Sequence, residues 1–378
     1  MNIPFNKPHL TGEEFKFMRE AHLIGQLAGD GYFTKKCSKW LEEKFNTPKA
    51  LLTHSCTAAL EMAAILAEIK RDDEIIMPSY TFVSTANAFV LRGGIPVFVD
   101  IRADTLNIDE RLIEGAITPK TKAIVVVHYA GVACEMDEIM RIARKHNLLV
   151  IEDAAQAILA SYKGRALGSI GDFGCLSFHE TKNIISGEGG ALLINNKNYI
   201  SRAEMIREKG TNRSEFYRGM SDKYTWRDIG SSFLPGELTA AFLWAQFLRA
   251  EEITEKRLRL WDYYEDSFQK LFNEKLVHGP SKSKYGKDNG HIYYLMLNNI
   301  EQRTQFISSL KAQGINCPFH YIPLHSSIGG IKFARIFGQM TVTESAADRI
   351  VRLPLWIDME PEMQKAIIRD VRLFFGQG

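Results

Sequence analysis

The chain has 378 residues, enough for two or three domains and a large hydrophobic core. Its 47 Lys and Arg residues stand against 45 Asp and Glu residues, so the formal net charge of +2 favours no nucleic-acid or membrane partner over a small molecule. Hydrophobic residues make up 45% of the chain and charged residues 24%, which excludes a disordered, collagen-like or low-complexity protein.

The cysteines are scattered and never spaced as C-x-x-C: Cys37, Cys56, Cys134, Cys175 and Cys317. This pattern favours a reducing cytosol over a disulfide framework or a zinc site, and we expect no metal. Residues 1–10 are interrupted by polar residues and two prolines where a signal peptide needs an apolar run. The most apolar stretch, 123–133, is shorter than a bilayer span. We therefore expect a cytoplasmic protein.

The first half of the chain alternates β-branched runs with segments of helical periodicity. We predict strands at 50–52, 74–77, 95–99, 122–127 and 148–152, and helices at 57–69, 81–92 and 135–146. The spacing is that of a parallel sheet covered by crossover helices. In the last of these helices, Met136, Ile139, Met140 and Ala143 form an apolar stripe that we expect to pack into the core.

The second half departs from this rhythm. We predict two strands at 173–178 and 191–194, a long helix over 237–271, an exposed loop over 278–290, a strand at 292–297, a helix at 302–313, a strand near 315–321 and a final helix opened by Pro361. This order predicts a large domain over residues 1–240 and a smaller α+β domain over 241–378. The long helix connects the two domains.

Ligands of open parallel sheets bind beyond the carboxyl ends of the strands, so the residues there are candidates for a site. Small hydroxyl-bearing residues in 53–57 open a helix, where backbone N–H groups and the macrodipole favour a phosphate; a plain helix cap explains the same pattern. Asp153 ends a hydrophobic run and needs a cation or several donors, although an acid that caps the next segment is the alternative.

Lys182 follows the strand at 173–178 and precedes the glycines of 187–190. A lysine beside a phosphate site can lose its proton and form an imine, whereas a lysine considered by itself is more often an ordinary surface residue. Tyr80 and Phe82 follow the second strand and either belong to the core or stack on a planar ligand. Together, a phosphate cradle, a buried acid, a lysine and an aromatic plate describe a pyridoxal phosphate site.

Beyond these features, the chain resembles the DegT/StrS family of nucleotide-sugar aminotransferases that depend on pyridoxal phosphate (PLP) over nearly its whole length, from the segment 55–60 to the segment 321–325. Within the family, the segments 79–87, 127–137, 177–183 and 226–235 are similar to those of the dTDP-4-amino-4,6-dideoxygalactose transaminases. The resemblance implies an α/β fold of the aspartate aminotransferase type (PLP fold type I), with a mostly parallel central sheet in the large domain and a smaller C-terminal α+β domain.

The resemblance also implies roles for single residues. Lys182 corresponds to the Schiff-base lysine, Asp153 to the partner of the pyridine nitrogen, Gln156 to a donor to the ring hydroxyl and Phe82 to the aromatic ring stacked on the cofactor. Cys56 and Thr57, through backbone N–H, and Ser177, through its hydroxyl, correspond to the phosphate ligands. The family adds an asparagine from a neighbouring subunit, where this chain has Ser232, which is shorter and lacks the amide.

The implied reaction moves the amino group of L-glutamate to C4 of dTDP-4-keto-6-deoxy-D-glucose, giving dTDP-4-amino-4,6-dideoxy-D-galactose and 2-oxoglutarate. Arg207, Lys209 and Arg213 are candidates for the pyrophosphate, although a solvated helix end explains them equally well. Tyr321 and His325 match a family segment near the substrate channel. The family also implies a homodimer or higher homo-oligomer with shared sites, and neither a nucleic-acid nor a membrane partner.

Three alternatives stay open at this point. The enzyme could act on another nucleotide-linked 3- or 4-keto-6-deoxy sugar. It could be a PLP-dependent sugar dehydratase, but those relatives carry a histidine in place of Lys182. It could also be a non-catalytic regulatory or binding protein on the same fold, in which Lys182, Asp153 and Gln156 would be idle.

Overall fold

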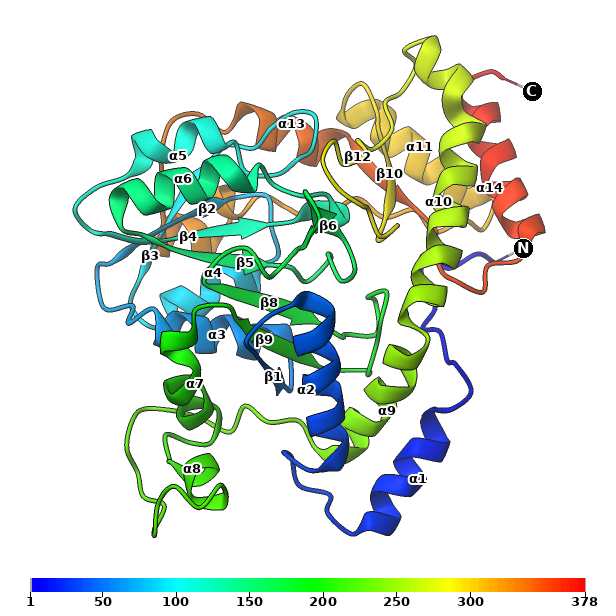
Figure 1. Ribbon diagram of the computed structural model, residues 1–378. Helices are drawn as coiled ribbons and strands as arrows, with labels where there is room; N and C mark the ends of the chain where they lie inside the picture. The colour runs from blue at the N-terminus through cyan, green and yellow to red at the C-terminus, as the bar shows by residue number, and fades with distance from the viewer. Residues whose placement is uncertain (1, 378) are drawn as a thin grey trace.

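A computed structural model of the chain describes residues 2–377. Its largest feature is an eight-stranded sheet in the order β1-β9-β8-β5-β4-β2-β3-β11 (Figure 1). Its strands are β1 (Lys49–Thr53), β2 (Glu74–Pro78), β3 (Ile95–Val99), β4 (Thr121–Val127), β5 (Leu149–Asp153), β8 (Phe173–Ser177), β9 (Gly190–Ile194) and β11 (Arg335–Ile336). All neighbouring strands from β11 to β8 pair in parallel. The expected mostly parallel central sheet is confirmed.

Only β9 runs against the other strands. It pairs antiparallel with β8 on one side and with β1 on the other, so β1 points the same way as β8. Thr53 and Ser177 both pair with Gly190, the first residue of β9. The carboxyl ends of β1, β5 and β8 therefore meet the start of β9 at one edge of the sheet.

Both faces of the sheet are buried under helices. Neighbouring residues such as Leu51 and Leu52 pack into different core clusters, as the two-residue period of a strand requires. One face is covered by α2 (Tyr32–Phe45), α5 (Glu110–Ala116), α6 (Met136–His146) and α9 (Glu237–Leu248). The other is covered by α3 (Cys56–Leu66), α4 (Val83–Val90) and α7 (Ile200–Arg207). The predicted apolar stripe of α6 packs into the first face, with Met136, Ile139 and Ala143 buried.

A smaller unit has its own core. It contains an antiparallel pair of strands, β10 (Tyr293–Met296) and β12 (Ile350–Leu353), packed among α10 (Ala250–Asn273), α11 (Ile300–Ala312), α13 (Thr341–Arg349) and α14 (Pro361–Phe374). Trp261 and Phe268 of α10 and Ile367 of α14 are buried in this core. Ile3 joins it by bridging to Ile315, so the first residues of the chain lie against this unit, while α1 (Glu14–Ile24) contacts α9.

Two predicted elements differ from the structure. The strand predicted near 315–321 is wrong: apart from the bridge at Ile315 the segment forms no ladder, because Pro318 has no N–H to donate and the backbone turns at Tyr321. The partner of β10 is instead β12, which the prediction missed. The predicted helix over 237–271 is two helices, α9 and α10, because the backbone leaves the helical region at Arg249 (φ −117°).

The remaining elements are short: β6 (Ser161–Tyr162), β7 (Arg165–Ala166), α8 (Arg213–Tyr217), α12 (Ile328–Phe333) and three 3-10 turns at Tyr129–Gly131, Lys197–Tyr199 and Leu324–Ser326. Within residues 2–377, none of the helices combines the length and the apolar character needed to cross a bilayer. Nor do the described residues contain a group of three His, Cys, Asp or Glu side chains arranged to hold a metal ion.

Candidate active site

The N-terminus of α3 forms an anion cradle at the convergent edge of the sheet. Ser55 caps the helix by accepting a hydrogen bond from the amide of Ala58 at 3.1 Å. Among the described residues no acceptor meets the amide N–H of Cys56 or Thr57, so both donors point out of the helix end. A helix end with two free N–H groups is a binding site for a phosphate.

Gly190 makes this cradle possible. A Cβ atom at position 190 would lie 2.4 Å from the carbonyl carbon of Ser55 and 2.5 Å from the amide nitrogen of Cys56. Real Cβ atoms do not approach backbone that closely, so any side chain would push β9 away from the start of α3. The glycine therefore lets the strand pack directly against the turn that opens α3.

Asp153 is the last residue of β5, and its carboxylate is buried at the same edge. Oδ2 accepts a hydrogen bond from the Thr85 hydroxyl at 2.7 Å, and Oδ1 accepts one from the Ala155 amide at 3.2 Å. Burial raises the pKa of Asp153, while these two bonds and the positive charge of Lys182 act in the opposite direction. A cation placed against the carboxylate would favour its ionised form.

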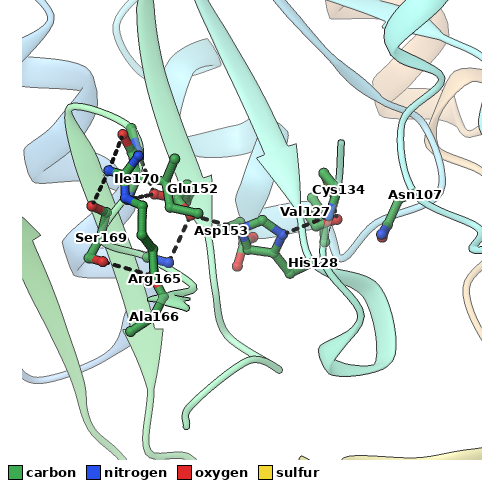
Figure 2. A network of polar contacts seen from close by, with 12 residues as sticks. Asn107, Val127, His128, Cys134, Glu152, Asp153, Arg165, Ala166, Ser169 and Ile170 are labelled. Atoms are coloured by element: carbon green, nitrogen blue, oxygen red, sulfur yellow. Dashed lines mark hydrogen bonds and ion pairs between the residues drawn. The ribbon is translucent and has the colours of Figure 1, made fainter. Parts of the chain in front are cut away.

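Behind Asp153 lies a fully buried polar network (Figure 2). Glu152, the residue before Asp153 in β5, accepts hydrogen bonds from the amides of Gly168, Ile170 and Gly171 at 2.6–2.8 Å. His128 Nε2 lies 2.9 Å from the same carboxylate. Because the Cys134 amide donates to His128 Nδ1, the Nε2 atom carries the proton and donates to Glu152. Four donors make this buried carboxylate tolerable and tie the end of β5 to the loop before β8.

Lys182 lies in the loop between β8 and β9 and is partly buried. Burial lowers the pKa of Lys182, and Arg352 adds to the lowering, against the attraction of Cys56 and Asp153. The next residue, Asn183, fixes the loop: its Nδ2 donates to the carbonyl of Asn289 at 2.8 Å and its Oδ1 lies 2.8 Å from His291 Nδ1. A lysine amine with a lowered pKa is closer to the neutral, nucleophilic form.

Gln156 follows Asp153 by three residues and lies at the same edge. Its Oε1 accepts a hydrogen bond from the amide of Ala130 at 2.7 Å, and its Nε2 donates to the hydroxyl of Tyr321 at 2.9 Å.

Ser177 ends β8 with a buried side chain, whose Oγ accepts a long hydrogen bond of 3.4 Å from the amide of His179. Phe82 is the N-cap residue of α4 and is 58% exposed, one helical turn before Thr85.

A second group of predicted residues gathers elsewhere, around α7 and α8. Arg207 is buried and pairs with Asp30 at 2.9 Å. Lys209 and Arg213 lie 3.9 and 3.5 Å from Glu208. Ser232 is exposed and bridges to Glu208. This group adjoins the site edge within the same chain, because the amide of His54 donates to the carbonyl of Phe233. The roles of these four residues toward ligands stay predictions.

His325 contacts the loop after β2. Its Nδ1 lies 2.7 Å from the hydroxyl of Ser79, and its Nε2 lies 3.3 Å from Glu344. Sequence reasoning missed Thr85, the partner of Asp153, and His291, the partner of Asn183. Thr85 lies inside a predicted helix and within the resembling segment 79–87, but nothing local marks it as a partner of Asp153, and His291 stands between a predicted loop and a predicted strand.

The chain is similar to characterised proteins over most of its length. The spore coat polysaccharide biosynthesis protein SpsC of Bacillus subtilis is 33% identical over 335 residues, which cover 85% of this chain and 84% of that protein. GDP-perosamine synthase of Caulobacter vibrioides is 31% identical over 364 residues, covering 91% and 95%. The PLP-form structure of the putative sugar aminotransferase Spr1654 of Streptococcus pneumoniae superposes with a TM-score of 0.91 at 25% identity, covering 99% and 98%.

The lysine, the buried carboxylate and the anion cradle at one edge of this fold define a class: an aminotransferase of PLP fold type I, with pyridoxal phosphate as its cofactor. The family model of the DegT/DnrJ/EryC1/StrS aminotransferases matches residues 8–372. The chain belongs to this family and is a PLP-dependent sugar aminotransferase. The expected family, fold class, enzyme class and cofactor are confirmed, in preference to a dehydratase or a non-catalytic protein.

Proposed function

We propose that the enzyme transfers the amino group of L-glutamate to C4 of dTDP-4-keto-6-deoxy-D-glucose, with dTDP-4-amino-4,6-dideoxy-D-galactose and 2-oxoglutarate as products. The observation that carries the transamination is the meeting of Lys182, Asp153 and the free amides of α3 at one sheet edge. The choice of sugar and of C4 rests on the resemblance of segments 79–87, 127–137, 177–183 and 226–235 to the dTDP-4-amino-4,6-dideoxygalactose transaminases.

The residues present fit pyridoxal phosphate. The amides of Cys56 and Thr57, with the hydroxyl of Ser177, would bind the phosphate, and Asp153 would face the pyridine nitrogen as its counter-ion. The Gln156 amide would donate to the ring hydroxyl, and the exposed Phe82 ring would cover one face of the cofactor. When bound, the cofactor supplies a ring that accepts electrons from the carbon losing its proton.

Lys182 has two tasks in this proposal. It would hold the cofactor covalently at rest, and its Nζ atom would then carry the proton between the substrate carbon and the cofactor carbon as general base and acid. Burial, which lowers the pKa of Lys182, increases the fraction of neutral amine available for proton abstraction. Asp153 would remain ionised against the protonated ring nitrogen and so preserve the electron sink.

The test is direct. The purified enzyme is incubated with L-glutamate and dTDP-4-keto-6-deoxy-D-glucose, and the product ring is assigned by NMR couplings. An axial amine at C4 supports the proposal, whereas amination at C3 or no turnover contradicts it. Borohydride should tag the native chain at Lys182 and leave Lys182→Ala untagged; a half-reaction with glutamate that persists in the variant would count against the lysine.

One observation favours a second candidate substrate. The relative from Caulobacter vibrioides is a GDP-perosamine synthase, which makes a GDP-linked 4-keto-6-deoxy sugar the alternative. The same assay with the GDP-linked sugar separates the two, because the preferred nucleotide gives the higher kcat/KM at equal glutamate.

We also propose a homodimer or a higher homo-oligomer. Large apolar side chains are exposed together in the segment 217–229, where Trp226 is 81% exposed and Met220 72% exposed. Monomeric proteins rarely leave such a patch uncovered. Light scattering should give at least twice the chain mass, and a monomer at micromolar concentration would contradict the shared site.

The five free cysteines, four of them buried, support a reducing compartment such as the cytoplasm.

A further inference from the structure

Tyr321 lies at the site with a hydroxyl whose proton no described residue accepts. We propose that Tyr321 acts with Gln156 as a second donor to the phenolic oxygen of the cofactor ring, and thereby sets the pH at which the nitrogen linking Lys182 to the cofactor loses its proton. The inference rests on the proposed function, because it takes the ring hydroxyl to lie beside Gln156.

The orientation of the Gln156 amide is fixed by its two contacts. Oε1 accepts from the Ala130 amide at 2.7 Å, so the other end must be the NH₂ group, which donates to Tyr321 at 2.9 Å. An NH₂ group has two hydrogens, and one of them has no acceptor among the described residues. Asn289 holds the Gln156 backbone by donating to its carbonyl at 2.8 Å. Gln156 therefore presents one free donor in a fixed direction.

Tyr321 presents the second donor. Since its oxygen accepts from Gln156, the proton on that oxygen remains available. Burial raises the pKa of Tyr321, so the phenol stays protonated, and the charges of Asp153 and Cys56 both act on it. Because Gln156 follows the end of β5 by three residues and its Nε2 lies 2.9 Å from the Tyr321 oxygen, the hydroxyl lies beside the end of β5, where the cofactor is proposed to bind.

The Tyr321 ring has little freedom to turn away. It stacks on His320 with ring centroids 3.7 Å apart and meets the edge of Tyr80 at 5.5 Å. His320 is itself held by a 2.7 Å bond between its Nδ1 and the Tyr129 hydroxyl. The Tyr321 backbone has φ 29°, in the left-handed region that aromatic residues avoid. Strain of this kind persists where the surrounding structure fixes a side chain for a task.

Two donors on the phenolic oxygen have a predictable effect on the linkage. When bound, the cofactor would supply a phenolic oxygen that accepts from the protonated linkage nitrogen, and the donors of Gln156 and Tyr321 would compete for the same lone pairs. They therefore stabilise the deprotonated linkage more than the protonated one and lower its pKa. In this step a proton leaves the nitrogen for solvent, and no other bond forms or breaks.

The other titratable and charged groups that face this point come from several elements: Lys182 from the β8–β9 loop, Asp153 from β5, Cys56 from α3, Tyr80 from the β2–α4 loop, Tyr129 from the turn after β4, Tyr294 and His291 beside β10, His320 before Tyr321, and Arg352 from β12. Burial lowers the pKa of both His291 and His320, so neither changes charge above neutral pH. A substitution at Tyr321 leaves all of these groups in place.

The experiment follows the visible absorbance of the loaded enzyme from pH 5.5 to 10. Tyr321→Phe should raise the midpoint of the spectral transition by about one pH unit, a tenfold change in the proton dissociation constant. Tyr80→Phe is the matched control, because this buried hydroxyl in the same cluster donates to the His320 carbonyl at 3.3 Å and not to Gln156. An unchanged midpoint in Tyr321→Phe, or an equal shift in Tyr80→Phe, overturns the inference.

A second substitution covers the case in which the Tyr321→Phe variant does not bind the cofactor. Replacing Tyr321 by 3-fluorotyrosine keeps the ring and the hydroxyl but makes the phenol a stronger donor, so the midpoint should fall. A midpoint equal to that of the wild type overturns the inference. Failure of the proposed function appears differently, as a wild-type enzyme with no visible band and no borohydride tag at Lys182.

Discussion

Replacing Glu152 by Gln removes the charge at the centre of the network in Figure 2 while keeping its shape. In the native protein Oε1 accepts from Ile170 and Gly171, and Oε2 accepts from Gly168 and His128. A glutamine amide can accept from only one of these pairs, and its NH₂ group faces two donors on the other side. His128 cannot reverse its tautomer without turning an N–H toward the amide of Cys134.

The expected loss follows from the two bonds that fail. Hydrogen bonds to a charged group contribute roughly 1.5–3 kcal/mol each, so the variant should lose about 3–6 kcal/mol of unfolding free energy. At about 2.1 cal/mol/K per residue, a cooperative unit of 378 residues has an unfolding entropy of about 0.8 kcal/mol/K. The melting temperature should therefore fall by about 4–8 °C.

Differential scanning calorimetry of the loaded enzyme measures this shift. Glu138→Gln is the control, because Glu138 lies on the surface of α6 and Arg141 is its only ion-pair partner among the described residues. It should melt within error of the wild type. A decrease of less than about 1 °C in the melting temperature of Glu152→Gln would refute the view that the buried carboxylate depends on its charge to hold four donors.

Three further predictions concern the site edge. Gly190→Ala should weaken cofactor binding at least tenfold, about 1.4 kcal/mol, because its Cβ would lie 2.4 Å from Ser55 backbone; a titration of the apoenzyme that matches the wild type would contradict the close packing. Asp153→Asn should slow the half-reaction with glutamate by roughly 10²–10³-fold, measured by stopped-flow absorbance, because an amide cannot act as a counter-ion; a native rate would exclude Asp153 as the partner of the ring nitrogen. Lys182→Met should raise the melting temperature of the apoenzyme at pH 7. Burial lowers the pKa of Lys182 in the folded state, so protonation of the lysine is less favourable in the folded than in the unfolded state, and the native lysine destabilises the apoenzyme fully below its folded pKa and less as the pH rises above it. The difference should vanish as the pH rises through the unfolded value of about 10.4; a difference that persists at pH 11 would contradict this origin.

Much of the large sheet could be predicted from local pattern. The strands at 74–77, 95–99 and 122–127 match β2, β3 and β4 closely, because continuous β-branched runs between helical segments report burial on both faces. The strand predicted near 315–321 failed because a short apolar run does not say which strand it pairs with. Pro318 and the turn at Tyr321 prevent a ladder there, and β12 takes the place beside β10.

The site, like the sheet, has features that local sequence predicts and features that only the fold decides. Cys56, Asp153, Gln156, Ser177 and Lys182 could be identified by their positions after predicted strands and by motif. That they meet at one edge depends on β9, whose reversed direction brings Gly190 between Thr53 and Ser177.

The sequence by itself determined the type of most elements, the chemical kind of the site and the family, because periodicity and short motifs are properties of neighbouring residues. Only the tertiary structure decided which side chains are partners. Thr85 meets Asp153 from a position 68 residues away, and Tyr321 meets Gln156 from 165 residues away. No local pattern encodes such contacts, because the sheet order and the packing of the smaller unit against its edge set them together.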